Sequence, residues 1–551
     1  MQKNTTRILL GLILASAFIL RIWGLGLDEL IFDEGLYSFR SIGYLDYLES
    51  PYQTTPVQWF TNGERQRTIL SESEGLPWWL NLSFHDHPPL LFLIQHLFFS
   101  IFGDSLFAAR LPSALFGLAS VYLIYLIGRK LFDEKMGLIS AFIFAVSFAH
   151  ASVSRLAMME GLLFFFILAN IYYFLKFLGS ASSPQAIKRD WWKFGLTFGL
   201  AILTKYIAVF LLPVYLTIWI LKSKDRPSSK HILGAAGIAL IIFSPVIVYN
   251  ILSYKTFGHF DLQLAYILKQ KTPWPVNEFG GKTQEPFSDI WGNLTTIFSL
   301  PFLIVAVVGL GFLFWKNDRR KKFLPMILLF LSATLLLTQT GAAIRFVSLY
   351  IISFVFFAAV PFVLLWNKKP KLAFILFTIF AAHEIFFTAE RIFINPPDYG
   401  VVKLDKYLES VLGNGRSEIV PQHPNPYLNA VIQKHAASIP ITLEPTGLIY
   451  DDNLATNPML WLFARREYYH AIPIMTASKF QESLKNNPAM FKNVTLYFAK
   501  AEPAAPVNPI RQTDYAKQVE QFLISQNQKP VMLITGSENM PAFRVYKFSL
   551  K

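Results

Sequence analysis

The chain contains no cysteine, and charged residues make up only 16% of its 551 positions. The absence of cysteine excludes disulfides and thiolate metal sites. The low charge is more informative, because a soluble chain carries about 25% charged residues. Hydrophobic residues reach 53%, with 52 Phe, and the mean hydropathy is +0.39. This composition excludes a soluble globular enzyme, a disordered chain and a fibrous repeat, so we expect most of the protein to lie in a lipid bilayer.

Ten apolar runs are candidates for membrane-spanning helices, which need about 20 residues to cross the hydrocarbon. The first run carries Arg21 and Trp23 near its end and lacks a small-residue cleavage pattern. We therefore interpret it as a retained anchor rather than a signal peptide. The runs cover residues 8–27, 106–128, 137–153, 158–178, 194–221, 232–252, 291–314, 323–338, 346–366 and 371–388.

The basic residues predict the orientation, because short loops rich in Lys and Arg stay in the cytoplasm. Five loops, near residues 129–135, 188–193, 222–230, 316–322 and 368–371, hold 18 basic residues against five acids. Residues 28–87 instead hold ten acids and three Arg, which predicts an outer loop. This distribution accounts for much of the net charge of +14. Nucleic acid is therefore not expected as a partner.

Two segments decide the number of crossings. The run at 89–103 is too short, and a crossing there would turn the basic loop at 129 outward, so we expect an interfacial or re-entrant helix. The run at 194–221 lies between two basic loops and must cross twice, turning at Thr204-Lys205-Tyr206. The result is eleven transmembrane helices, with the N-terminus in the cytoplasm and the C-terminus outside.

The composition changes after residue 391, where Asn395-Pro396-Pro397 is typical of a linker. Beyond it, polar helical stretches alternate with β-like runs at residues 494–498, 531–535 and 543–548. We predict a transmembrane domain over residues 1–391, whose first outer loop spans 28–105 with interfacial helices. An extracytoplasmic α/β domain follows over 392–551. The fold class is a mainly α, polytopic helical bundle with this C-terminal domain.

Several charged residues gather on the predicted outer face, where charge near a membrane is costly and invites a functional reading. Acids and cations that converge at one membrane face suggest a reaction on a lipid-linked anionic substrate. The set comprises Asp33, Glu34, His85, Asp86, His87, Arg155, Glu160, Lys205, His259 and Arg345.

Short motifs follow one another in order around these residues. They are Phe32-Asp33-Glu34-Gly35-Leu36-Tyr37, His87-Pro88-Pro89-Leu90, Phe102-Gly103-Asp104-Ser105, Arg110-Leu111-Pro112-Ser113, Gly128-Arg129-Lys130-Leu131-Phe132, Ser154-Arg155 with Glu160, and residues 199–205. Their ordered occurrence, over about residues 7–390, resembles that in the protein O-mannosyltransferase-like membrane glycosyltransferases of the GT-C superfamily, which include the lipid A aminoarabinose transferases.

The resemblance implies a GT-C helical bundle and a donor sugar carried on a polyprenyl phosphate, transferred outside the membrane with inversion at the anomeric carbon. Asp33 matches the family's base position, and Glu34 would orient the acceptor or assist. Arg155, Lys205 and Arg345 are candidates to stabilise the leaving phosphate, as Arg and Lys do in oxyanion sites. The alternative for each cation is snorkelling toward lipid headgroups.

A divalent ion, Zn²⁺, Mn²⁺ or Mg²⁺, is a candidate cofactor, because some relatives bind one through an acid just before the double proline. Asp86, His87 and His85 have suitable chemistry, with His259 as a distant partner. The alternative is that His87 only caps the interfacial helix. Glu160 stands where relatives usually have Asp, near the acceptor or the metal.

We therefore expect an integral membrane glycosyltransferase that moves one sugar from a polyprenyl-phosphate donor to an acceptor hydroxyl of a protein, lipid or glycan. An oligosaccharyltransferase-like ligase with a diphosphate donor is one alternative. A transporter or flippase of lipid-linked sugar is another, although transporters usually show related halves and midplane polar residues. The active site and the C-terminal domain are expected outside the cytoplasm.

Overall fold

A computed structural model describes residues 3–50, 55–61, 77–179, 184–221, 228–268, 270, 286–314, 317–509 and 512–550. Within the predicted basic loops, Lys222, Lys224, Arg226 and Lys316 lie outside these residues. The chain forms two compact units. The helical unit comprises residues 1–26, 87–94 and 105–395, and the mixed unit comprises 27–86, 95–104 and 396–551.

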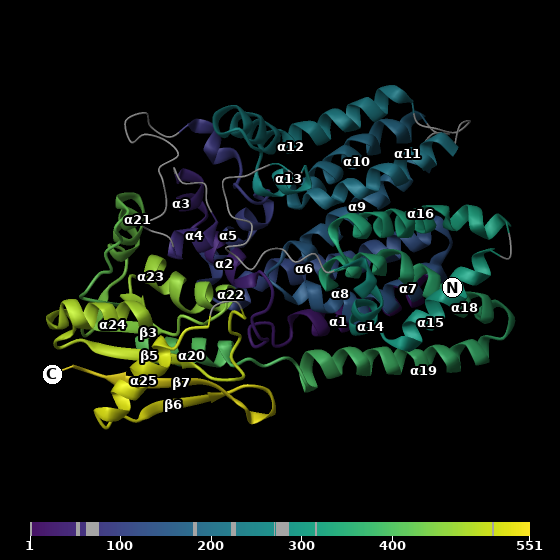
Figure 1. The fold of residues 1–551 in the computed structure, drawn as a ribbon. Helices are drawn as coiled ribbons and strands as arrows, with labels where there is room; N and C mark the ends of the chain where they lie inside the picture. The colour runs from purple at the N-terminus through teal and green to yellow at the C-terminus, as the bar shows by residue number, and fades with distance from the viewer. Residues whose placement is uncertain are drawn as a thin grey trace. The chain divides into compact units, whose positions relative to one another are not determined.

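The helical unit consists of long apolar helices, several of which run side by side (Figure 1). Its elements are α1 (Lys3–Ile22), α6 (Leu106–Leu131), α7 (Glu134–Val146), α8 (Phe148–Arg155), α9 (Met159–Gly179), α10 (Pro184–Thr204), η2 (Tyr206–Phe210), α11 (Leu211–Leu221), α12 (Ser229–Phe257), α13 (Leu262–Ile267), η3 (Phe287–Asp289), α14 (Ile290–Ile297), α15 (Leu300–Phe314), α16 (Asn317–Thr340), α17 (Ile344–Val347), η4 (Ser348–Tyr350), α18 (Ile351–Lys368), α19 (Pro370–Ala389) and η5 (Glu390–Ile394).

Local sequence explains where these helices begin, end and cross. Ser105 and Asp133 cap α6 and α7, each accepting from a backbone amide three residues ahead. Gly258, with φ 79°, ends α12 in the left-handed conformation that glycine favours. The α6 and α7 backbones touch at Gly128 and Gly137, where an added Cβ on Gly137 would lie 3.0 Å from the Arg129 amide nitrogen. Small residues at such crossings are typical of membrane helices.

Seven helices in the described residues are long and apolar enough to cross a membrane, and up to nine if each of two bent pairs is one span. The α7–α8 pair bends by 56° and the α14–α15 pair by 112°. The second bend interrupts the run predicted at 291–314. Phe298, the C-cap of α14, is extended, and Pro301 lies in the first turn of α15, where a proline is tolerated because its missing N–H would have no intrahelical partner. The count of eleven spans stays a prediction.

The two doubtful segments behave locally as expected. Helix α5 (Leu90–Phe102) has 13 residues, fewer than a crossing needs. The run at 194–221 is interrupted between α10 and η2, where Lys205 alone is extended (φ −160°, ψ 133°). The break therefore falls at the predicted turn Thr204-Lys205-Tyr206.

The mixed unit combines helices with a five-stranded sheet, coloured yellow and green in Figure 1. Its elements are α2 (Glu34–Ile42), α3 (Tyr44–Glu49), α4 (Pro56–Thr61), η1 (Trp78–Leu82), α20 (Val401–Leu412), β1 (Arg416–Ser417), α21 (Pro426–Ala436), β2 (Ile441–Leu443), β3 (Thr446–Tyr450), α22 (Thr456–Met459), η6 (Leu460–Ala464), α23 (Arg465–His470), β4 (Ile474–Thr476), α24 (Ala477–Asn486), η7 (Pro488–Phe491), β5 (Thr495–Ala501), α25 (Tyr515–Ser525), β6 (Pro530–Thr535), η8 (Ser537–Asn539) and β7 (Pro541–Phe548).

The strand order of the sheet is β4-β3-β5-β7-β6, and β1 and β2 form a separate parallel pair. Strand β3 is parallel to β4 and β5, whereas β7 is antiparallel to β5 and β6. Phe480, Val519 and Leu523 from α24 and α25 join Phe498 and Tyr546 in a buried core. The strands β5, β6 and β7 coincide with the three β-like runs of the sequence. The predicted fold class, a helical bundle with a C-terminal α/β part, is confirmed.

Aromatic side chains from distant parts of the sequence share one core in the mixed unit. Trp59 stacks on Tyr47 at 3.8 Å between ring centroids and lies 5.8 Å from Tyr468. Phe39 lies 5.2 Å from Tyr469. The segment before α5 thus packs with residues beyond 396. The domain boundary at 391/392, with 28–105 in the transmembrane domain, stays a prediction.

Candidate active site

The break between α10 and η2 places a lysine against a glutamate of α9. The Lys205 Nζ lies 2.6 Å from Glu160 Oε1, and the two side chains are 13% and 3% exposed. Because Lys205 is extended between two helices, its side chain leaves the helical register. Two residues predicted to act at the site therefore meet in a buried ion pair.

Arg345 joins the same cluster through the ring of Phe346. The Lys205 Nζ lies 4.8 Å from the centroid of this ring, and the Arg345 Cζ lies 5.2 Å from it. Lys205 directly precedes the short helix η2, and Arg345 lies in the short helix α17. Two cations beside one carboxylate give the cluster a net positive charge, which suits an anionic ligand.

A second polar cluster, which the sequence analysis missed, centres on Asp261. Its Oδ2 accepts from the Tyr206 hydroxyl and, at 2.8 Å, from Asn250 Nδ2, while Oδ1 accepts from the Leu264 amide at 2.9 Å. Burial raises the pKa of this carboxyl, and these hydrogen bonds with the charge of His87 offset part of the effect. An Asp directly before the α13 run is an N-cap signal that sequence reasoning could have used.

Three other residues that the sequence analysis proposed for the site belong to the helical unit, and each has its own contacts. The His87 Nε2 lies 3.4 Å from Gln263 Nε2. His259 is buried, and its Nδ1 lies 2.9 Å from the Phe260 carbonyl oxygen. Arg155 donates to the Leu20 carbonyl at 3.1 Å and lies over the Phe393 ring at 5.4 Å.

Asp33 and Glu34 form a tight turn at the start of α2 in the mixed unit. Phe32 has φ 51°, an uncommon conformation for a non-glycine residue, and Asp33 follows as the N-cap of α2. The Tyr37 hydroxyl donates to Asp33 Oδ2 at 3.5 Å. Glu34 is fully buried, and its Oε2 accepts from the Ile31 amide at 3.1 Å. Glu34 therefore helps to hold the turn that presents Asp33.

Asp86 is bound by an arginine. Its Oδ1 lies 2.6 Å from Arg40 Nη1, and both side chains are buried. Among the residues that the structure describes, no group of three or more His, Asp or Glu side chains is arranged to hold a metal ion. The donor set thus does not fit a ready metal site, and the divalent ion held by His85, Asp86, His87 and His259 stays a prediction.

The site residues fall into two sets. Asp33, Glu34, His85 and Asp86 belong to the mixed unit, and His87, Arg155, Glu160, Lys205, His259 and Arg345 to the helical unit. The structure brings Glu160, Lys205 and Arg345 together. That both sets share one pocket stays a prediction.

This chain is similar in sequence and in fold to known membrane proteins. The sequence model of the dolichyl-phosphate-mannose-protein mannosyltransferase family matches residues 86–249. The fold is similar to that of ArnT from Cupriavidus metallidurans bound to undecaprenyl phosphate, with a TM-score of 0.54 and 13% identity over 98% of this chain and 97% of ArnT.

Curated relatives match a shorter part. The putative mannosyltransferase YycA of Bacillus subtilis (strain 168) is 29% identical over 164 residues, 29% of this chain and 22% of the relative. An undecaprenyl phosphate-alpha-4-amino-4-deoxy-L-arabinose arabinosyl transferase of Pseudomonas paraeruginosa is 28% identical over 181 residues, 32% of each chain. The chain thus matches only 22% and 32% of the lengths of these two relatives.

The fold and the family match define a class: the chain is an integral membrane protein with the fold of the GT-C glycosyltransferases. The chain resembles the protein mannosyltransferases and the aminoarabinose transferases, so the resemblance drawn from the ordered motifs is confirmed.

Proposed function

We propose that the protein transfers one sugar from a polyprenyl-phosphate donor to an acceptor hydroxyl outside the membrane. The family match and the relatives named as mannosyl and arabinosyl transferases support this activity. The structure with a similar fold, ArnT, was determined with undecaprenyl phosphate, which supports a phosphate-linked lipid as the donor.

The observation that carries the proposal is the cluster of Lys205, Arg345 and Glu160. A sugar phosphate that loses its sugar becomes more negative, and fixed cations stabilise that charge best in a site shielded from water. Lys205 and Arg345 lie at the ends of helices in a unit built mainly of apolar helices. A charged side chain is costly in such surroundings, so its presence indicates a functional role. Arg155 is a further candidate for the lipid phosphate.

In the proposed reaction, Asp33 takes the proton of the acceptor hydroxyl. The acceptor oxygen forms a bond to the anomeric carbon from the face opposite the phosphate, and the bond between that carbon and the phosphate oxygen breaks. The electron pair leaves with the polyprenyl phosphate, whose charge Lys205 and Arg345 stabilise. One displacement inverts the anomeric configuration. Glu34 orients the acceptor through the turn that it holds.

The proposed topology has the N-terminus in the cytoplasm and the active site with the C-terminal part outside it. The acceptor is a protein, lipid or glycan.

The test uses the full chain reconstituted in nanodiscs, with undecaprenyl phosphate and undecaprenyl diphosphate as probes. We expect the monophosphate to bind, and lipid that co-purifies with the chain to carry a single sugar by mass spectrometry. Cells without the protein should lack one glycan that cells with it contain.

Three outcomes would contradict the proposal. Tighter binding of the diphosphate would favour the oligosaccharyltransferase-like alternative. Movement of labelled lipid-linked sugar across vesicles without a transfer product would favour a flippase. Binding of neither lipid would remove the donor class altogether.

A further inference from the structure

We propose that Asn457, in the C-terminal part of the chain, is a positioning residue for Asp33. The inference rests on the proposed function through the role of Asp33 as the base. It makes residues beyond 396 a working part of the transferase rather than a separate module, and all of its contacts lie within the mixed unit.

The direct contact is a hydrogen bond from the Asn457 Nδ2 to the carbonyl oxygen of Phe32, the residue that precedes Asp33. Phe32 is held at φ 51°, which costs a non-glycine residue free energy unless its surroundings impose it. The Asn457 amide binds the carbonyl of that turn. Its donor therefore helps to fix the peptide from which the Asp33 side chain projects.

Gly35 provides a second, independent contact with the same residue. A Cβ added to Gly35 would overlap the Asn457 carbonyl oxygen and lie 2.8 Å from its carbon atom. The first turn of α2 therefore touches the backbone of α22, and only glycine permits this approach. The glycine of the Asp33-Glu34-Gly35 motif is thus explained by a residue more than 400 positions later in the chain.

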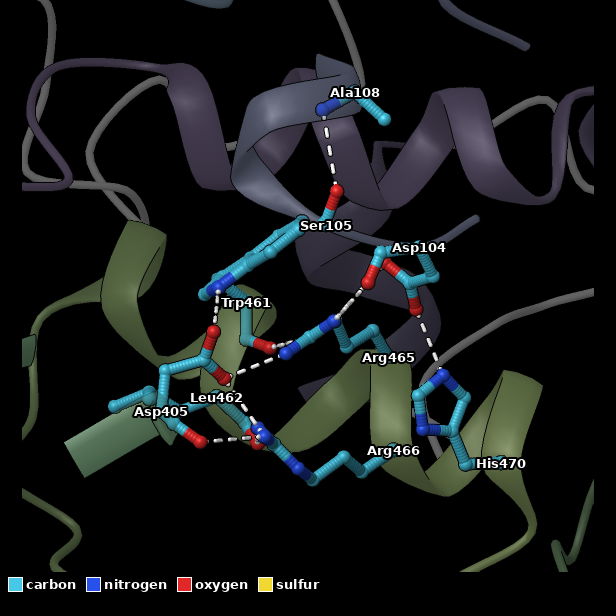
Figure 2. A network of polar contacts seen from close by, with 9 residues as sticks. All are labelled: Asp104, Ser105, Ala108, Asp405, Trp461, Leu462, Arg465, Arg466 and His470. Carbon is cyan, nitrogen blue, oxygen red and sulfur yellow. Dashed lines mark hydrogen bonds and ion pairs between the residues drawn. The ribbon is translucent and has the colours of Figure 1, made fainter. Parts of the chain in front are cut away.

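The element that carries Asn457 is anchored by a network of charges, shown in Figure 2. Helix α22 continues through η6 into α23, where Arg465 pairs with Asp104 at 3.0 Å and with Asp405 at 2.5 Å. Arg466 binds Asp405 at 2.7 Å, and His470 binds Asp104 at 2.7 Å. The pKa of Asp104 is held well below its usual range by Arg465 and His470, which outweigh the effect of burial.

The same network reaches α2 from its other end. Asp104 follows α5, whose Gln95 Oε1 accepts from the Ser41 hydroxyl of α2 at 2.7 Å. The His96 Nδ1 lies 2.9 Å from the Ser41 carbonyl oxygen. Helix α2 is therefore held at its start by Asn457 and at its end by α5. Helix α23 continues the segment that carries Asn457 and binds Asp104, which follows α5. Placement within about 1 Å matters for a base, because a shift of that size can cost about 10²-fold in rate.

The experiment compares Asn457→Ala with Asn453→Ala in the full chain. Asn453 is a matched control, because its Nδ2 also donates to a backbone carbonyl, that of Thr513, at 2.8 Å. We expect Asn457→Ala to lower kcat by about 10- to 100-fold while the affinity for undecaprenyl phosphate changes by less than about twofold. Asn453→Ala should leave kcat within about twofold of the wild type, even if it lowers thermal stability.

A second measurement keeps the inference separate from the proposed function. Hydrogen exchange of the amides from Ile31 to Tyr37 should be at least about tenfold faster in Asn457→Ala and unchanged in Asn453→Ala. Unchanged exchange at these amides would overturn the inference whatever the activity, and so would equal loss of kcat in both variants. Faster exchange in Asn457→Ala, together with a wild-type chain that transfers no sugar, would contradict the proposed function alone.

Discussion

The two units use buried charge differently. In the helical unit, Lys205 forms an ion pair with Glu160 and lies over the ring of Phe346. In the mixed unit, Asp405 accepts from Arg465, Arg466 and the Trp461 indole together. An ion pair at a helix end, with a second cation beside it, suits a ligand that exchanges partners with it, whereas a carboxylate bound by three groups suits assembly. Mutations should therefore affect binding in the first unit and stability in the second, except at Asp33 and at Asn457, which positions it.

Asp33→Asn tests the exception and should have the largest effect. The amide cannot take the acceptor proton, so we expect turnover to fall by about 10²- to 10⁴-fold. Undecaprenyl phosphate should still bind, since its proposed ligands lie elsewhere. Single-turnover transfer measures the rate, and Asp28→Asn, the same change five residues earlier, is the control. Turnover like that of the wild type would remove Asp33 as the base.

Asp405→Ala tests the assembly role of the mixed unit. It leaves two buried guanidinium groups and an indole without this acceptor, which should cost about 3–5 kcal/mol of stability. Hydrogen exchange of α20 and α23 measures the loss. The exposed Asp514–Lys517 pair, 70% exposed on each side, is the control, and Asp514→Ala should cost less than about 0.5 kcal/mol. Equal effects would mean that the network does not stabilise the unit.

Lys205→Ala tests the binding role of the helical unit. Loss of one charge-assisted contact should weaken undecaprenyl phosphate binding by about 10- to 100-fold. Glu160→Gln should change affinity in the opposite direction, because it removes the anion that competes with the phosphate. Both are titrations in nanodiscs, with Lys371→Ala on α19 as the control. Unchanged affinity in Lys205→Ala would reassign this lysine to headgroup contact.

Glu467→Gln should have the smallest effect and a pH signature. Burial raises the pKa of Glu467 to about 8, and nearby Lys479 offsets only part of this. The unfolded chain loses this proton near its usual value of 4.5, so stability falls as the pH rises from there to about 8. Glutamine should add at least about 1 kcal/mol at neutral pH and flatten this dependence. Thermal unfolding of wild type, Glu467→Gln and the exposed-site variant Glu409→Gln would measure it, and parallel pH profiles would contradict it.

Much of the fold and part of the site could be predicted from the sequence. Apolar runs located most long helices, and alternating patterns located β5, β6 and β7, since both follow from periodicity. The break at Lys205 followed from the charges of its flanking loops. The bends before α8 and α15 were missed, because an apolar run has the same composition whether it is straight or broken. Asp261 and its partners were missed because they are spread over three separate segments.

Sequence by itself determined that this chain enters a membrane and carries acids and cations of glycosyltransferase type in a particular order. Hydrophobicity and motif order are local properties, so no coordinates are needed to read them. Only the tertiary structure decided that Lys205 meets Glu160 and Arg345, and that Asn457 supports the turn before Asp33. The hydrogen bonds of Lys205 to Glu160 and of Asn457 to Phe32 join residues 45 and 425 positions apart, and chain folding, rather than any neighbouring residue, brings all of these groups together.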